Sequence, residues 1–208
     1  MFGQFLFPRL MERINKLEAR IQELESALER LSTSGVGRLN DYLTFHDESE
    51  CVTARLTGIN LQIVNGEGNT QSVNCKGNLI LGYNEPHTEG TVNRSGSHNL
   101  IIGIRHNYSS YCGIVNGMAN NIHGEYGTIL NGRECYAYAS HVTMCGGNDH
   151  KGNGSYSTLL SGFDNGGMGS RSVFIEGVNN RAEHDNTIFI GGGGETSSHD
   201  GEIIPPLP

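Results

Sequence analysis

A short pattern of apolar and polar residues returns along the middle of the chain, from about Asn78 to Gly191. Each copy has a small or polar residue, two or three apolar residues, often one more polar residue, and then glycine. The eight copies end at Gly82, Gly103, Gly117, Gly132, Gly146, Gly162, Gly177 and Gly191. Successive closing glycines are 21, 14, 15, 14, 16, 15 and 14 residues apart, so the chain contains an internal repeat.

The length of the repeat predicts a parallel β-solenoid with about 14–15 residues per coil. A helical repeat needs a longer unit, whereas two short strands and two turns fill this one. The closing glycines supply positive φ or allow close approach of the next coil. The expected apolar ladder through the stack is Ile80, Ile101, Val115, Leu130, Leu160, Ile175 and Phe189. Because each coil offers so few apolar side chains, we expect the stack to need partner chains.

Nearer the N-terminus the apolar period changes to 3.5 residues. Spacings of four and three alternate through Leu10, Ile14, Leu17, Ile21, Leu24, Leu28 and Leu31. This unbroken a/d seam predicts a parallel coiled coil over residues 10–32. In a parallel assembly in register, Arg13 faces Glu18 of a neighbouring chain, and Arg20 faces Glu25.

The number of strands in this coiled coil is open to two interpretations. Isoleucine at a and leucine at d favour two strands. Residues 13–18 and 20–25, however, both resemble the Arg-apolar-x-x-apolar-Glu motif of short trimeric coiled coils, and we therefore predict a homotrimer. The alternative, a surface helix packed on its own domain, conflicts with the polar outer faces of the helix.

Both ends of the chain are apolar. The predicted segments are residues 1–9 for assembly, 10–32 for the coiled coil, 33–76 for a transition and first coils, 77–194 for the repeats, and 195–208 for a proline-containing tail. Unclosed contacts between unlike ends generate filaments, so we predict head-to-tail assembly. The predicted assembly residues are Phe2, Phe5, Leu6, Phe7, Ile203, Ile204 and Leu207. An alternative is that the N-terminal segment folds back onto its own helix.

Composition narrows both the type of fold and the kinds of partner that we expect. Glycine accounts for 30 of 208 residues, tryptophan is absent and 17% of residues are charged, which suits a solenoid better than an ordinary globular enzyme. The net charge of −8 argues against nucleic acid, and no apolar run is long enough to predict a membrane span. Residues 1–10 also lack the pattern of a secretory signal.

Cysteine and histidine offer candidate chemistry. The five cysteines form no C-x-x-C pair; we expect Cys145 to be a small buried core residue, and Cys112 could form a disulfide with Cys135. The nine histidines lack metal-ligand spacing, and we interpret them as exposed turn residues. A metal site made by one residue copied around a threefold axis stays open as an alternative.

The motifs of catalysis that we sought do not occur. There is no Gly-x-Ser-x-Gly nucleophile elbow, and the run of four glycines before Glu195 lacks the Lys-Ser/Thr ending of a phosphate loop. We therefore predict a protein that is not an enzyme, with no catalytic, cofactor-binding or metal site.

The glycine-closed repeats, together with a coiled coil on the same chain, resemble the heads of trimeric autotransporter adhesins. The resemblance covers residues 60–191. It implies a left-handed parallel β-roll with two strands per coil, and three rolls around a common axis. The chain departs from that family because its helix precedes the repeats, and because a long stalk and an outer-membrane anchor are missing.

The resulting functional expectation is a structural subunit of an extracellular or cell-surface fibre that polymerises with itself. The alternative is the receptor- or surface-binding head of an adhesin or phage fibre, which contacts cell-surface glycans or proteins. Tyrosines could supply those contacts or could pack between chains: Tyr83, Tyr108, Tyr111, Tyr126, Tyr136 and Tyr138.

Overall fold

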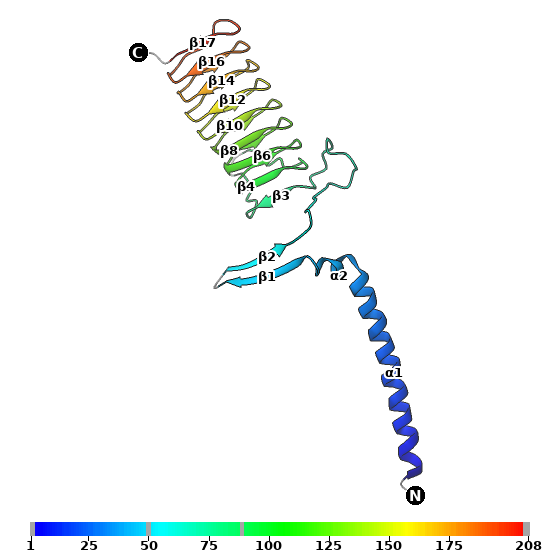
Figure 1. The fold of residues 1–208 in the computed structure, drawn as a ribbon. Coiled ribbons are helices and arrows are strands. Elements are labelled where there is room, and N and C mark those ends of the chain that lie inside the picture. The colour runs from blue at the N-terminus through cyan, green and yellow to red at the C-terminus, as the bar shows by residue number, and fades with distance from the viewer. Residues whose placement is uncertain (1–2, 49–50, 88–89, 206–208) are drawn as a thin grey trace. The chain divides into compact units, whose positions relative to one another are not determined.

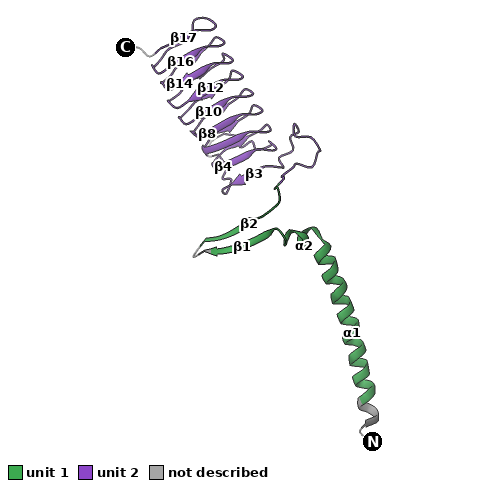
Figure 2. Cartoon of the chain, viewed as in Figure 1, with its two compact units in different colours: residues 1–61 green, residues 62–208 purple. Residues whose placement is uncertain are grey.

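The computed structural model describes residues 3–48, 51–87 and 90–205, except for the side chains of residues 3–6 and 48. The chain divides into two compact units, Met1–Leu61 and Gln62–Pro208, which Figure 2 distinguishes by colour. Helices and strands carry the labels of Figure 1.

The first unit contains two helices and one hairpin. Helix α1 (Gly3–Thr33) begins before the first residue of the heptad seam and includes Pro8. Helix α2 (Gly35–Leu39) is capped by Ser34, whose side chain accepts a hydrogen bond from the Gly37 amide at 3.1 Å. Strands β1 (Leu43–Glu48) and β2 (Cys51–Leu56) pair antiparallel.

No described side chain of the first unit is buried. The seven seam residues of α1 are between 37% (Ile14) and 67% (Leu28) exposed. On the hairpin, Phe45 pairs with Ala54, and Phe45 and Val52 are each 66% exposed. Neither a lone helix nor a two-stranded hairpin can cover its own apolar side, so the described residues of this unit form no buried core.

The second unit is a parallel β-solenoid with two sheets (Figure 1). The larger sheet has nine strands in the order β17-β16-β14-β12-β10-β8-β6-β4-β3. Their bounds are β3 Leu79–Leu81, β4 Leu100–Ile104, β6 Ile114–Met118, β8 Thr128–Arg133, β10 Thr143–Cys145, β12 Thr158–Leu160, β14 Val173–Ile175, β16 Ile188–Ile190 and β17 Ile203–Ile204. The predicted parallel β-solenoid preceded by a helix is therefore confirmed.

The smaller sheet has six two-residue strands in the order β15-β13-β11-β9-β7-β5. Their bounds are β5 Asn107–Tyr108, β7 Asn121–Ile122, β9 Tyr136–Ala137, β11 Lys151–Gly152, β13 Gly166–Gly167 and β15 Arg181–Ala182. The six coils that begin with β4, β6, β8, β10, β12 and β14 thus contribute one strand to each sheet, as a period of two strands and two turns requires.

Strand pairing fixes the length of a coil. Ile101 pairs with Val115 and Val115 with Ile129, which are steps of 14 residues. From Ile129 onwards each step is 15 residues, through Met144, Leu159, Phe174, Phe189 and Ile204. The spacing of glycines therefore matches the coil length only to within one residue.

The extra residue of the 15-residue coils lies at the end of the long strand, where the register between β6 and β8 shifts after Val115. The 14-residue coils have one positive-φ residue at this point, Gly103 or Gly117, whereas the coils from Met144 onwards have two in succession, as at Gly146 and Gly147. Seven of the eight predicted closing glycines have positive φ. The exception is Gly132; in that coil only the preceding Asn131 (φ 54°) takes the left-handed conformation at this point.

The core is a column of inward-facing residues, one from each long strand. Its buried members are Ile101, Val115, Ile129, Met144, Leu159, Phe174 and Phe189. The prediction that Leu130, Leu160 and Ile175 belong to this column was wrong, because side chains alternate along a strand and their preceding neighbours point inward. Ile80, in the first strand, is 39% exposed.

A second, polar column also runs inside the solenoid. Asn120 shows its pattern: its side-chain oxygen accepts the Cys135 amide at 3.0 Å, and its side-chain nitrogen donates to the Gly132 carbonyl at 2.8 Å. The same place in other coils is held by His106, His150, Asn165 and Asn180, all buried. These side chains satisfy backbone groups that the turns leave unpaired.

Candidate assembly interface

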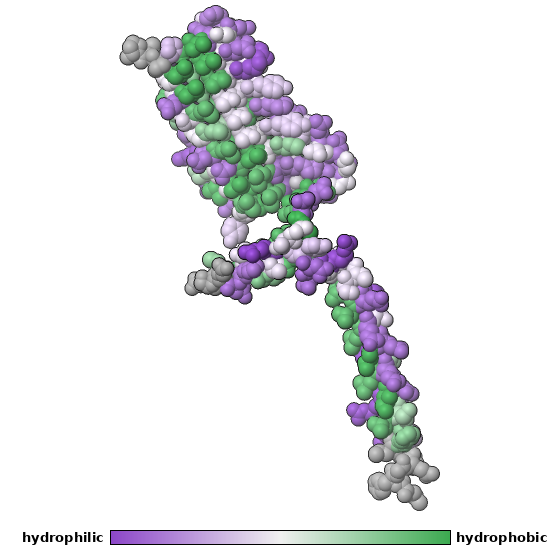
Figure 3. Space-filling view, in the orientation of Figure 1, coloured by the Kyte–Doolittle hydropathy of each residue, from purple (hydrophilic) through white to green (hydrophobic). Residues whose placement is uncertain are grey.

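The outer face of the nine-stranded sheet consists of the residues on either side of each inward-facing one. These are Leu79, Leu81, Leu100, Ile102, Ile114, Asn116, Thr128, Leu130, Thr143, Cys145, Thr158, Leu160, Val173, Ile175, Ile188, Ile190 and Ile203. Figure 3 shows the face as green residues over these strands, paler towards the middle of the stack. We call this set the outer face.

The outer face carries no charged residue. Leu130, Ile175 and Ile190 are each 40–41% exposed. Three threonines in successive strands supply the polar part, and their β-branched side chains suit a pleated surface. Contiguous apolar patches on monomers are usually small, so this long uncharged face is a candidate interaction surface.

Cys145 lies on the outer face, so the prediction of a buried core cysteine was wrong. The predicted Cys112–Cys135 disulfide is not formed within the chain, because Cys112 belongs to the turn before a long strand whereas Cys135 lies inside the polar column. All five cysteines are free thiols. Burial raises the pKa of the Cys135 thiol, and also that of Cys112.

The seam of α1 is the second uncovered apolar surface. Leu17, Leu24 and Leu28 are 54–67% exposed, and the predicted interchain partners Arg13, Glu18 and Glu25 lie on the same exposed helix. Arg20 pairs with Glu23 of its own helix at 2.9 Å. An exposed pair of this kind contributes less than about 1 kcal/mol and can exchange for an interchain partner.

The predicted head-to-tail residues fall into different environments. Phe7 is 68% exposed, whereas Phe2, Leu207 and the side chains of Phe5 and Leu6 lie outside the described residues. Ile203 and Ile204 form β17, and Ile204 packs against the core. The sheet therefore continues into the predicted tail, and β17 pairs with β16 at one edge of the described sheet.

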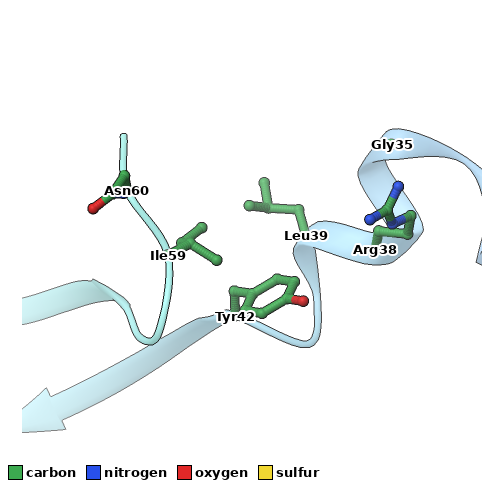
Figure 4. Close-up of a pocket in the computed structure, with 6 residues that line it drawn as sticks. All are labelled: Gly35, Arg38, Leu39, Tyr42, Ile59 and Asn60. Atoms are coloured by element: carbon green, nitrogen blue, oxygen red, sulfur yellow. The ribbon is translucent and has the colours of Figure 1, made fainter. Parts of the chain in front are cut away.

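A hollow of about 300 Å³ lies within the first unit (Figure 4). Leu39, Tyr42 and Ile59 point toward one another across it, and Arg38, Asn60 and Gly35 complete its lining. Its lining offers apolar contact and one cation, the guanidinium of Arg38.

The histidines occupy both exposed and buried places. His141 is exposed in a turn, but the interpretation as exposed turn residues was wrong for His106 and His150, which are 1% and 0% exposed. Burial lowers the pKa of both. The Nδ1 of His150 accepts the Asn165 amide at 3.2 Å, while its Nε2 bonds the Ser161 carbonyl at 2.8 Å. The residues that the structure describes contain no group of three or more His, Cys, Asp or Glu that could hold a metal.

The candidate tyrosines separate into buried and exposed sets. Tyr108 is 3% exposed, so it is not a surface contact, whereas Tyr83 is 95% exposed. Tyr126 packs against His141 in a tilted arrangement with ring centroids 4.9 Å apart, and His141 stacks on Tyr156 at 4.6 Å. This aromatic stack follows the turns that precede the long strands.

Comparison with protein-family models, with curated proteins and with solved structures finds no match to this chain. Within the described ranges, no helix combines the length and the apolar character that crossing a membrane requires. The two uncovered apolar surfaces are therefore the features of this chain that best indicate a function.

Proposed function

We propose that this protein is a non-enzymatic structural subunit of an extracellular or cell-surface fibre, in which three parallel chains form a rod and rods join end to end. The observation that carries the proposal is that two long apolar surfaces, the outer face and the α1 seam, are uncovered in the single chain. Parallel copies of the chain can bury both surfaces at once.

Three chains are favoured over two by the paired Arg and Glu motifs of α1 and by the resemblance of the repeats to adhesin heads. A trimer gives the first unit the core that it lacks. It also covers residues such as Leu130 and Ile190 of the outer face, which are otherwise about 40% exposed.

Joining of rods uses the open edge of the solenoid. Strand β17 leaves backbone donors and acceptors at its second edge, and Ile203 is 62% exposed beside them. We propose that residues 1–8 of one trimer dock on the last coil of the next. Such a contact joins unlike surfaces and does not close, so it produces a filament.

Negative-stain electron microscopy and sedimentation of the full chain, beside a chain that lacks residues 1–8, test the proposal. We expect long uniform fibres from the full chain. The shortened chain should give discrete particles of three times its own chain mass, which is slightly below the 22.5 kDa of the full chain. Monomers from the shortened chain contradict the trimer, and filaments from it contradict the role of residues 1–8.

A receptor- or surface-binding head is the second candidate. The observation that favours it is the exposed aromatic rings, including Tyr138 (46% exposed) and Tyr156 (60% exposed). A binding head forms discrete trimers in the full chain and needs a ligand, so the same microscopy separates the two functions.

A further inference from the structure

A polar hollow of about 300 Å³ lies on the solenoid, where the insertion between β3 and β4 reaches the turns that follow the long strands. Its lining is His87, Arg105, Met118, Ala119, Arg133, Glu134, Tyr136 and Asp149. The volume is at the lower end of the roughly 300–1,000 Å³ range of ligand pockets.

A short side chain in a column of long ones opens this hollow. Arg105, Ala119, Glu134 and Asp149 hold the same place in successive coils, all with positive φ (61°, 57°, 53° and 60°). Each amide of the last three bonds a carbonyl of the preceding coil at 3.0 Å. The walls are therefore held by the regular backbone of the stack, and only Ala119 lacks a side chain that could fill the space.

The lining contains as many positively charged hydrogen-bond donors as negatively charged acceptors, two of each. Arg105 and Arg133 contribute guanidinium donors, and Glu134 and Asp149 contribute carboxylate acceptors. Arg133 Nε lies 3.4 Å from Glu134 Oε1. A pair of neighbouring hydroxyls can donate to a carboxylate and accept from a guanidinium at once. A polyanion, by contrast, meets two carboxylates here.

Aromatic and apolar surfaces lie beside these polar groups. Met118 and the Ala119 methyl contribute an apolar part of the lining. Burial, and then the neighbouring Tyr138 and acidic groups, raise the pKa of Tyr136, so its phenol stays a donor. Tyr136 stacks with Tyr138 at 5.6 Å, and Tyr138 stacks with His123 at 5.3 Å. Rings of this kind contact the C–H faces of sugars.

We propose that this hollow binds a short neutral saccharide. The guanidiniums and carboxylates bond its hydroxyls, Met118 and Ala119 contact its carbon atoms, and the stacked tyrosines extend the contact surface. Such a site serves a fibre subunit or a binding head equally, and it does not depend on polymerisation.

Saturation-transfer NMR and titration calorimetry on the full chain test this site, with maltotriose, lactose and tri-N-acetylchitotriose as neutral probes. Sialyllactose and inorganic phosphate are the anionic comparisons. We expect at least one neutral probe to bind. Ala119→Glu places in the gap a side chain that the same column accepts at Glu134, and should weaken binding at least about tenfold.

Asn179→Glu is the matched control, because Asn179 holds the same place in a later coil outside the hollow. It should leave affinity unchanged. Arg133→Gln removes an exposed guanidinium and should also weaken binding, which keeps the test valid if Ala119→Glu unfolds. Full affinity in both Ala119→Glu and Arg133→Gln overturns the site. Absence of any neutral binding at millimolar concentration, or binding of the anions alone, overturns the ligand class.

Discussion

The two units of the chain differ in the burial of their apolar side chains. In residues 1–61 no described side chain is buried, although the seam repeats every 3.5 residues. In the solenoid, the inward column from Ile101 to Phe189 is no more than 2% exposed. A coil covers the apolar residue of the coil before it, whereas a helix has nothing in its own chain to do so. The solenoid therefore has an apolar core within one chain, whereas the described residues of the first unit form none.

The largest expected effect is on the first unit. Ile21→Glu combined with Leu24→Glu removes about 4 kcal/mol of apolar burial per chain from a coiled coil, and places carboxylates in the seam. We expect sedimentation to show loss of the trimer and circular dichroism to show loss of helix. The solenoid should retain its own unfolding transition, because neither Ile21 nor Leu24 belongs to its core.

Ala19→Glu provides the control, since position 19 faces away from the seam in the heptad and is exposed. It should leave the trimer intact. Trimers that persist in the double variant, with full helix content, mean that the seam is not what joins the chains.

A smaller effect is expected inside the solenoid. His150→Ala leaves the Asn165 amide and the Ser161 carbonyl without their side-chain partner, which should lower the free energy of unfolding by about 2–4 kcal/mol. Urea unfolding measures the change. His150→Asn should cost less, because Asn120, Asn165 and Asn180 hold the same place. Equal losses in the two variants show that the polar column does not act through its hydrogen bonds.

Acid should produce the smallest effect, and only in the solenoid. Burial lowers the pKa of His106 and His150, against a value of about 6.5 in an unfolded chain. The carboxylates of Asp164 and Asp149 act the other way on His150, and Arg94 adds to the lowering for His106. Below about pH 6.5 the unfolded state binds more protons, so the free energy of unfolding falls until the pH reaches the folded pKa.

The melting temperature of the solenoid should fall as the pH is lowered from 7.5 to 5, the range in which histidine titrates. The variant His106→Asn/His150→Asn should be flatter over that window. A wild-type slope equal to that of the double variant contradicts the assignment of acid sensitivity to the polar column.

Much of the fold is predictable from the sequence, but which residue of each strand points into the core is not. The repeat and the 3.5-residue seam follow from spacing alone. The inward residue does not, because in Thr-Ile-Leu or Val-Phe-Ile every position accepts an apolar or β-branched side chain. The error at Leu130 and Ile175 came from that ambiguity. The burial of His106 and His150 was not predicted, because their place in the coil is recognisable only by its hydrogen bonds. Histidine and asparagine can both make those bonds, but they form no common hydropathy pattern in the sequence.

The outer face, in contrast, could have been predicted from the sequence. Only one residue in each three-residue strand can point inward, so the two apolar neighbours must point out. Two or three consecutive apolar residues in most copies therefore already imply an uncovered sheet face. The saccharide site had no such signal, since its walls come from Arg105 and Asp149, which are 44 residues apart and meet only through the coil spacing.

The constant register of the later coils also sets how the length of this solenoid can change. Removing residues 145–159 joins Met144 to Leu160, which holds the place of Cys145 one coil later, so every column stays continuous. Adding a 15-residue unit has the same property. The body can therefore be shortened or lengthened in whole steps of one strand spacing, about 4.8 Å each, while a change that does not correspond to a whole coil shifts the core and the polar column out of register together.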